Sequence, residues 1–150
     1  MKGKGFLIAF ICDHCPFVTH LSNHFTSLFN NWMKLGIKVY AISSNDSLQY
    51  PADSPNEMAI LSKRLEFCFP YLYDSTQEVA KSYNAVCTPD FFLFKEDKKL
   101  FYRGQYDSSR PSNDISITGA DITNAVNLML EGKKPPKNQI PSLGCNIKWK

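Results

Sequence analysis

The chain has 150 residues, of which 43% are hydrophobic and 21% charged, and its formal net charge at pH 7 is +3. This length suits a single domain with its own core, and the composition excludes a disordered chain and a coiled coil. The basic residues are scattered except in the last eighteen positions, so the sequence predicts no nucleic-acid-binding surface.

The first expected element is a buried strand at residues 6–11. Its continuous apolar run is typical of a parallel strand that is covered on both faces. The run is shorter than the ~7–15 residues of a secretion signal, and no stretch approaches the ~18 apolar residues that cross a bilayer. We therefore expect a cytoplasmic protein that does not bind membranes.

A short loop at residues 12–15 follows, and Pro16 suits the first position of a helix because that position needs no N–H partner. Apolar residues keep helical spacing up to Met33, and Gly36 is a suitable end for this helix. The later elements are expected in this order: a strand at 37–43, a helix at 54–66 opened by a capping box of Ser54 and Glu57, a strand at 71–73, a helix at 75–83 capped by Asp74, a hairpin of strands 91–94 and 100–105, and a helix at 119–131 capped by Thr118.

This order of elements predicts an α/β fold in which helices flank a central sheet on both faces. We expect one domain over residues 1–132 and an extended C-terminal tail over residues 133–150, where three prolines exclude a helix. In such sheets, chemistry gathers at the carboxyl ends of the parallel strands. Cys12 and Cys15 directly follow the first strand, so the sequence predicts an active site there.

The pair Cys12-x-x-Cys15 is the strongest chemical signal in the chain. A thiolate is the reactive form of cysteine, and the start of a helix lowers a thiol's pKa. Because Cys15 directly precedes Pro16, we expect an exposed, acidified sulfur at the helix start. We predict that Cys15 is the nucleophile, that Cys12 resolves the intermediate, and that His14 supplies positive charge or moves a proton.

Two other interpretations of these cysteines stay open. Both residues can be small buried hydrophobic side chains. They can also bind a metal with His14 and with His20 or His24, although the second donor pair of a typical zinc site is missing from the sequence.

Thr88-Pro89 is a second signal, because it directly precedes the apolar strand at residues 91–94. Cys-x-x-Cys-Pro-Phe, Thr-Pro-Asp-Phe-Phe-Leu-Phe and the ending Gly-Cys-Asn-Ile-Lys-Trp-Lys together resemble the thioredoxin-like superfamily. The closer match is its redoxin branch of alkyl hydroperoxide reductases and thiol-specific antioxidants, in a bacterial subfamily. The resemblance covers residues 5–131. It implies a thioredoxin-like fold with a mixed central sheet, a cis-proline at Pro89 beside Thr88 that faces the active-site cysteine, and a short or missing N-terminal segment.

A thiol–disulfide oxidoreductase is the function that the motif and the resemblance favour. It would act on a disulfide-bearing protein or a low-molecular-weight disulfide, with an external thiol reductant and without a bound cofactor. A thiol peroxidase is the alternative. Aligning Cys15 with the peroxidase cysteine, however, puts Ile8 and Cys12 at the proline and threonine positions of the peroxidase motif, and no arginine stands near the cis-proline. A metal-binding module of the same fold is a third hypothesis.

Two further cysteines have open roles under this fold. Cys87 precedes Thr88-Pro89 and is expected near the active-site loop, as a second resolving thiol or as a packed side chain. Cys145 in the tail is either a resolving partner, within the chain or on a neighbouring one, or an unpaired thiol.

Overall fold

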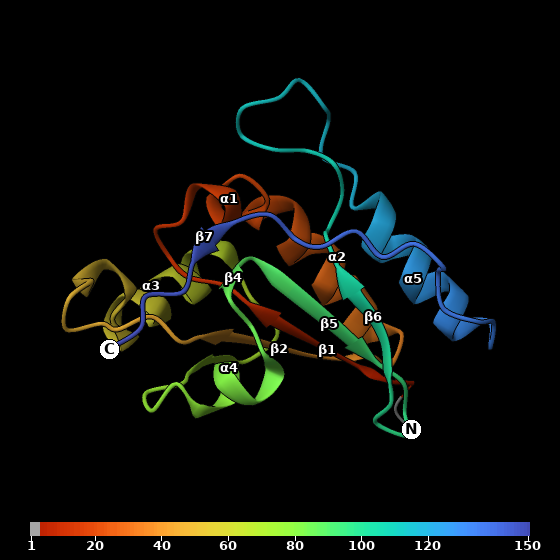
Figure 1. Cartoon of the computed structure of the whole chain (residues 1–150), viewed down its shortest axis with the longest axis horizontal. Coiled ribbons are helices and arrows are strands. Elements are labelled where there is room, and N and C mark those ends of the chain that lie inside the picture. The colour runs from red at the N-terminus through yellow and green to blue at the C-terminus, as the bar shows by residue number, and fades with distance from the viewer. Residues whose placement is uncertain (1–3) are drawn as a thin grey trace.

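The computed structural model describes residues 4–150 and has a five-stranded sheet at its centre (Figure 1). The strands of this sheet are β1 (Phe6–Phe10), β2 (Lys38–Ser43), β3 (Tyr71–Tyr73), β5 (Asp90–Phe94) and β6 (Leu100–Gly104), in the order β3-β2-β1-β5-β6. The first three run parallel, whereas β5 is antiparallel to β1 and β6 is antiparallel to β5. The predicted mixed sheet is therefore confirmed.

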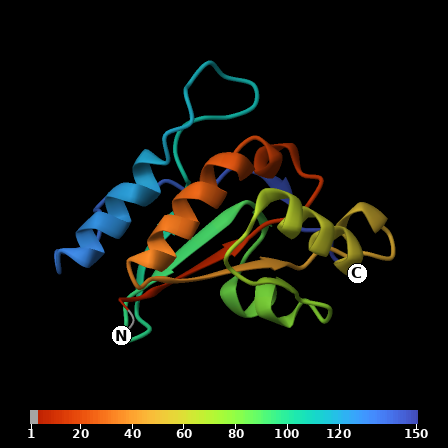
Figure 2. The ribbon, with the colours of Figure 1, turned by 180° about the vertical axis from the view of Figure 1, so that it is seen from behind.

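Helices cover both faces of this sheet. They are α1 (Pro16–Thr19), α2 (Ser22–Lys34), the 3-10 turn η1 (Pro51–Asp53), α3 (Pro55–Leu65), α4 (Glu78–Tyr83) and α5 (Ala120–Leu130). Figure 2 shows α2 and α5 side by side over one face and α4 on the other. Leu7 and Ala9 face the first group, and Ile8 and Phe10 pack on the α4 side. This double coverage explains the continuous apolar run of β1.

The prediction of one helix from Pro16 to Met33 is wrong, because the chain forms two helices there. The N–H of Leu21 donates to the carbonyl of Val18 over 3.0 Å, which closes a tight turn between α1 and α2. Val18, Leu21 and Phe25 are all buried, so the apolar spacing continues across the break and does not reveal it.

Side chains hydrogen-bond near the start of three helices, but only Ser54 is itself the N-cap residue, because Gln77 and Gly119 take that position in α4 and α5. Ser54 Oγ accepts from the N–H of Glu57 over 3.3 Å, as the capping box predicts. The carboxylate of Asp74 accepts from the N–H groups of Val79 and Ala80, so α4 begins at Glu78, later than expected. Thr118 Oγ1 accepts from Ala120 N–H over 3.2 Å at the start of α5.

The C-terminal tail lies along the domain in an extended conformation and is held in place over its length (Figure 1). Its strand β7 (Cys145–Asn146) pairs antiparallel with β4 (Cys87–Thr88). Ile140 O accepts from Gln105 N–H over 2.8 Å, and the Lys148 N–H donates to Asn45 Oδ1 over 2.9 Å. The tail is therefore ordered on both sides of β7. Among residues 4–150, we find no helix with the length and apolarity to cross a bilayer.

Candidate active site

Cys12 and Cys15 lie in the loop between β1 and α1, at the carboxyl end of β1 as predicted. The Ile11 N–H still donates to Ile42 O over 2.9 Å, so the loop leaves the sheet directly after this bond. Both cysteines are only 1% exposed. The expectation of an exposed Cys15 sulfur is therefore wrong, because the β4–β7 ladder lies over it.

Thr88 contacts both sulfurs. The Cys15 thiol lies 3.4 Å from the Thr88 carbonyl oxygen, and Cys12 Sγ lies 3.5 Å from Thr88 Oγ1. The peptide bond between Thr88 and Pro89 is cis, as the resemblance implies. The structure thus brings Cys12, Cys15, Thr88 and Pro89 together, although they come from two segments more than seventy residues apart.

The two thiols have opposite acidities. A hydrogen bond from Cys12 lowers the pKa of Cys15 to about 4, against the effect of burial, and further hydrogen bonds from Cys145 and Thr88 act in the same direction. The pKa of Cys12 is raised, because its proton is held in the bond to Cys15 and because it is buried. The Thr88 carbonyl opposes a thiolate at Cys15, but the thiol and hydroxyl donors around the sulfur outweigh it.

Cys15 is the N-cap residue of the first helix, as predicted, but the causes of its low pKa are the neighbouring side chains. Helix α1 has only four residues, so its dipole is small, and the Cys15 side chain makes no capping bond to it. The neighbouring thiols provide the stabilisation instead.

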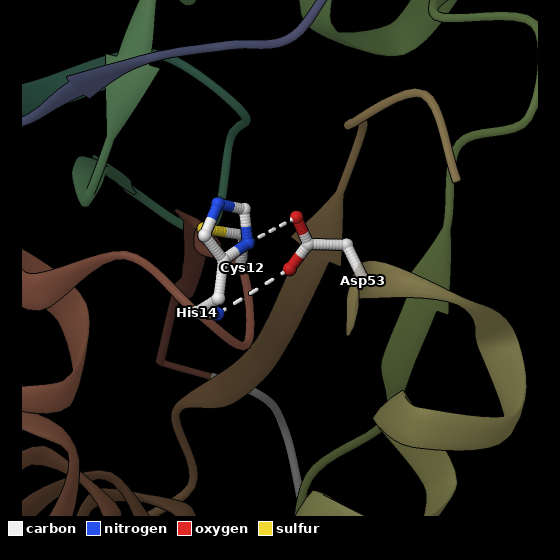
Figure 3. Close-up of side chains that lie close together, drawn as sticks. All are labelled: Cys12, His14 and Asp53. Atoms are coloured by element: carbon white, nitrogen blue, oxygen red, sulfur yellow. Dashed lines mark hydrogen bonds and ion pairs between the residues drawn. The ribbon is translucent and has the colours of Figure 1, made fainter. Parts of the chain in front are cut away.

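His14 is held by Asp53, a residue that sequence reasoning missed (Figure 3). Its Nδ1 lies 2.5 Å from Asp53 Oδ2. The other carboxylate oxygen accepts from the backbone N–H groups of Asp13, over 2.9 Å, and of His14, over 3.4 Å. Asn45 Nδ2 donates to Oδ2 over 3.0 Å. Asp53 is 0% exposed, so a fully buried carboxylate fixes the active-site loop from forty residues away. Its only sequence signal is its place just before the helix cap Ser54.

Cys145 and Cys87 differ in their distance from the site. Strand β7 sets Cys145 opposite Thr88, and the Cys145 sulfur interacts with that of Cys15. The Cys87 sulfur instead contacts the carbonyl oxygens of Pro89 and Ser142, each over 3.8 Å, and burial raises its pKa to about 11. Cys145 is therefore the third sulfur of the site, and Cys87 faces the tail.

Comparison with known proteins gives the family. The family model of the AhpC/TSA family matches residues 1–103. The chain belongs to the AhpC/TSA family. Among curated proteins, none matches the chain. This membership and the fold make the chain a thioredoxin-like redoxin and support a redox role for its cysteine site, whereas the narrower placement from the C-terminal motif stays a prediction.

Solved structures agree with this assignment. An uncharacterized conserved protein from Geobacillus kaustophilus is 52% identical, with a TM-score of 0.96 over 98% of this chain and 78% of that one. A hypothetical protein from Sinorhizobium meliloti is 41% identical, with a TM-score of 0.97 over 99% and 81% of the two chains. The thioredoxin domain of a thiol-disulfide oxidoreductase from Bacteroides vulgatus is 18% identical, with a TM-score of 0.62 over 86% and 81%, which shows the shared fold.

This AhpC/TSA protein also has three metal-ligating atoms close together. Cys12 Sγ, a ring nitrogen of His14 and an Asp53 oxygen all lie within 4.8 Å of one another. However, the Asp53 carboxylate already accepts from three backbone or amide N–H groups and from His14 itself, so a metal would have to replace these bonds. The current geometry fits a histidine–carboxylate pair better than a metal site.

The larger metal set with His20 or His24 is wrong. His20 Nε2 lies 2.8 Å from Ser109 Oγ, and His24 Nδ1 is hydrogen-bonded to the Tyr106 hydroxyl. Both imidazoles are thus tied to the segment after β6 and not to the cysteines.

Proposed function

We propose that this redoxin is a thiol–disulfide oxidoreductase in which Cys15 attacks the substrate and Cys12 resolves the intermediate. The observation that carries the proposal is the contact of both sulfurs with Thr88, which places Cys12 beside Cys15. There the neighbouring thiol lowers the pKa of Cys15 to about 4, while the pKa of Cys12 is raised, so Cys15 is the thiolate and Cys12 keeps its proton. A thiolate beside a protonated thiol suits a nucleophile that waits for its substrate.

The reaction has two exchanges. The Cys15 thiolate attacks one sulfur of the substrate disulfide, so a mixed disulfide forms and the other substrate sulfur leaves as a thiolate that takes a proton. Cys12 then loses its proton and attacks Cys15 Sγ, which releases the second substrate thiol and forms the Cys12–Cys15 disulfide. An external thiol reductant returns two electrons to the pair. As part of this proposal, we place the protein in the cytoplasm, where thiols are kept reduced.

His14 has a role in the second exchange. One of its ring nitrogens lies within 4.8 Å of Cys12 Sγ, and Asp53 fixes the orientation of the ring. We assign it the transfer of the Cys12 proton, which makes Asp53 a positioning residue. Thr88 contacts both sulfurs, and Pro89 joins it to β5, so they shape the wall against which the thiols lie.

A thiol peroxidase is the second candidate, favoured by the low pKa of a buried Cys15. Peroxide cleavage also needs donors that polarise the leaving oxygen. In the described part of the chain, Arg103 donates to Asp90 and Asn84, and Arg110 donates to Gln105 and to two carbonyls of its own loop. Neither of these two guanidinium groups is available to a peroxide at Cys15. The third arginine, Arg64, lines a cavity with Cys12 and Asp13 that Cys15 does not line, so disulfide exchange is the better-supported chemistry.

The test is a turbidity assay of insulin reduction with dithiothreitol as the reductant. We expect Cys15→Ser to abolish the activity and Cys12→Ser to form a mixed disulfide at Cys15 that mass spectrometry detects early in the reaction. Cys68→Ser is the matched control, because Cys68 is exposed and its thiol contacts only the carbonyl of Glu66. Full activity of Cys15→Ser would refute the proposal. In stopped flow with hydrogen peroxide, we expect consumption no faster than by free cysteine; faster consumption would favour the peroxidase.

A further inference from the structure

The short strand β4 has its edge filled by the chain's own tail. The register sets Cys145 opposite Thr88 and Asn146 opposite Cys87. The Ile147 N–H extends this pairing by donating to Val86 O over 3.0 Å. Because Thr88 O is also the carbonyl beside the Cys15 sulfur, any strand that pairs with β4 in this register brings one residue next to Cys15.

Cys145 is the residue that this pairing brings there. Cys145 lies opposite Thr88 and packs against the core cluster that includes Cys12 and Cys15. Its side chain and its backbone both lower the pKa of the Cys15 thiol. Cys12 and Cys145 thus both contact Cys15, and Cys145 is the more exposed of the two.

Gly144 allows the tail to approach so closely. A Cβ atom at this position would lie 1.9 Å from the carbonyl oxygen of Thr88 and 3.1 Å from the nitrogen of Pro89. A side chain at such distances would have to displace the Thr88–Pro89 backbone, so a strand that carries glycine before the residue that faces Thr88 enters this position most readily.

We infer that residues 144–147 occupy the place where an extended, cysteine-bearing strand of a substrate protein pairs with β4. The tail therefore competes with the substrate for this edge, and Cys145 is a second disulfide partner of Cys15. The inference rests on the proposed function and names its substrate class. Addition of a strand to an open edge recognises a peptide through its main chain, and the close contact at Gly144 selects a Gly-Cys sequence. Substrates are therefore extended polypeptides rather than small disulfides.

The disulfide between Cys15 and Cys145 forms by a rearrangement within the chain. The Cys145 thiolate attacks Cys15 Sγ of the Cys12–Cys15 disulfide. The Cys15–Cys145 bond forms, the Cys12–Cys15 bond breaks, and Cys12 leaves as a thiolate that takes up the proton lost by Cys145. The oxidation level of the chain stays the same, so no oxidant is consumed. The new bond fixes β7 across the site until the external thiol reductant cleaves it.

The first experiment follows the mixed disulfide that insulin forms with Cys15 in the full chain. In Cys12→Ser, we expect insulin to be released with time as the Cys15–Cys145 bond forms, which peptide mapping detects. In Cys12→Ser with Cys145→Ser, the mixed disulfide should persist. Equal persistence in both variants overturns the inference and leaves the proposed function intact, whereas no mixed disulfide in either variant refutes the proposed function itself.

The second experiment tests whether the tail covers Cys15. Gly144→Val cannot keep the close contact with Thr88, so we expect Cys15 to be alkylated by iodoacetamide about tenfold faster than in the unchanged chain. Gly132→Asn is the matched control, because it is also a glycine but has no atom within 4 Å of its Cβ position, and asparagine tolerates its positive φ. Unchanged protection of Cys15 in Gly144→Val overturns the inference.

The third experiment tests the substrate class and does not depend on how Gly144→Val folds. The probe is the peptide Ser-Leu-Gly-Cys-Asn-Ile, activated as its disulfide with 5-thio-2-nitrobenzoate and added to the Cys145→Ser chain. We expect it to form a mixed disulfide with Cys15 faster than the same peptide with valine in place of glycine. Equal rates for the two peptides contradict the selection of a Gly-Cys strand.

Discussion

The imidazole of His14 lies 2.5 Å from the carboxylate of Asp53, which comes from the turn η1 before α3. This contact joins two polar loops that the sequence separates by thirty-nine residues. Because the same carboxylate also accepts from the backbone of the active-site loop, it sets both the shape of that loop and the orientation of its histidine.

Removing the charge of Asp53 should destabilise the fold. In Asp53→Asn, one of the two accepting carboxylate oxygens is replaced by an N–H₂ group, which can only donate. This buried N–H₂ group would then face one of the N–H donors that bind the carboxylate. We expect the free energy of unfolding in urea to fall by about 2 to 3 kcal/mol. Asp114→Asn, at an exposed position, should leave it unchanged. Equal stability of the two variants would show that the Asp53 bonds contribute little.

The Cys15 thiol should titrate in the acid range. Ultraviolet absorbance of the thiolate is expected to appear with a midpoint near pH 4 in the reduced chain. In Cys12→Ala the main hydrogen-bond donor is lost, so the midpoint should rise toward the ordinary value of about 8.5. A midpoint that stays the same in Cys12→Ala would contradict the assigned cause.

The same thiol links stability to pH. The folded chain loses the Cys15 proton near pH 4, and the unfolded chain loses it near about 8.5, so unfolding takes up a proton between these values. The contribution of Cys15 to stability therefore grows as the pH rises through this window and is lost as the pH falls through the folded-state pKa. The difference in unfolding free energy between the unchanged chain and Cys15→Ala measures it.

Asp13 should have the opposite pH dependence. Burial raises its pKa to about 6, although a hydrogen bond from the Tyr71 hydroxyl over 2.8 Å counteracts this effect. Its contribution to stability is complete below the unfolded pKa and is lost as the pH rises through about 6. Asp13→Asn should remove this loss, as seen in urea midpoints between pH 4 and pH 7. Tyr71→Phe deletes the hydrogen-bond donor and should therefore enlarge the loss of stability as the pH rises. A smaller loss of stability in Tyr71→Phe would contradict the role of this bond.

Phe29 anchors the aromatic core beneath the site. It is 0% exposed and its ring contacts those of Phe25, Trp32, Phe69, Phe91 and Tyr106. We expect Phe29→Ala to lower the free energy of unfolding by about 3 to 5 kcal/mol, because it leaves a cavity and removes the ring contacts. Leu48→Ala, at a residue that is 88% exposed, is the control and should have almost no effect.

Local sequence signals predicted most of the elements. The apolar run of β1, the Ser54 cap of α3 and the hairpin of β5 and β6 depend on residues close together in the chain, and the structure has all three. The break between α1 and α2 was missed, because the buried residues keep their helical spacing through the turn. Apolar periodicity reports which side of the chain is buried and does not report a single tight turn.

By itself, the sequence determined that two thiols follow the first strand and precede a proline, because strand, loop and helix start are neighbours in the chain. Only the tertiary structure decided what surrounds those thiols. Asp53 beneath the loop and Cys145 over it come from a polar loop and a proline-bearing tail, whose residues have no periodic pattern. Hydrogen bonds between such segments depend on where the whole chain packs them, and so the acidity and the burial of Cys15 are properties of the fold.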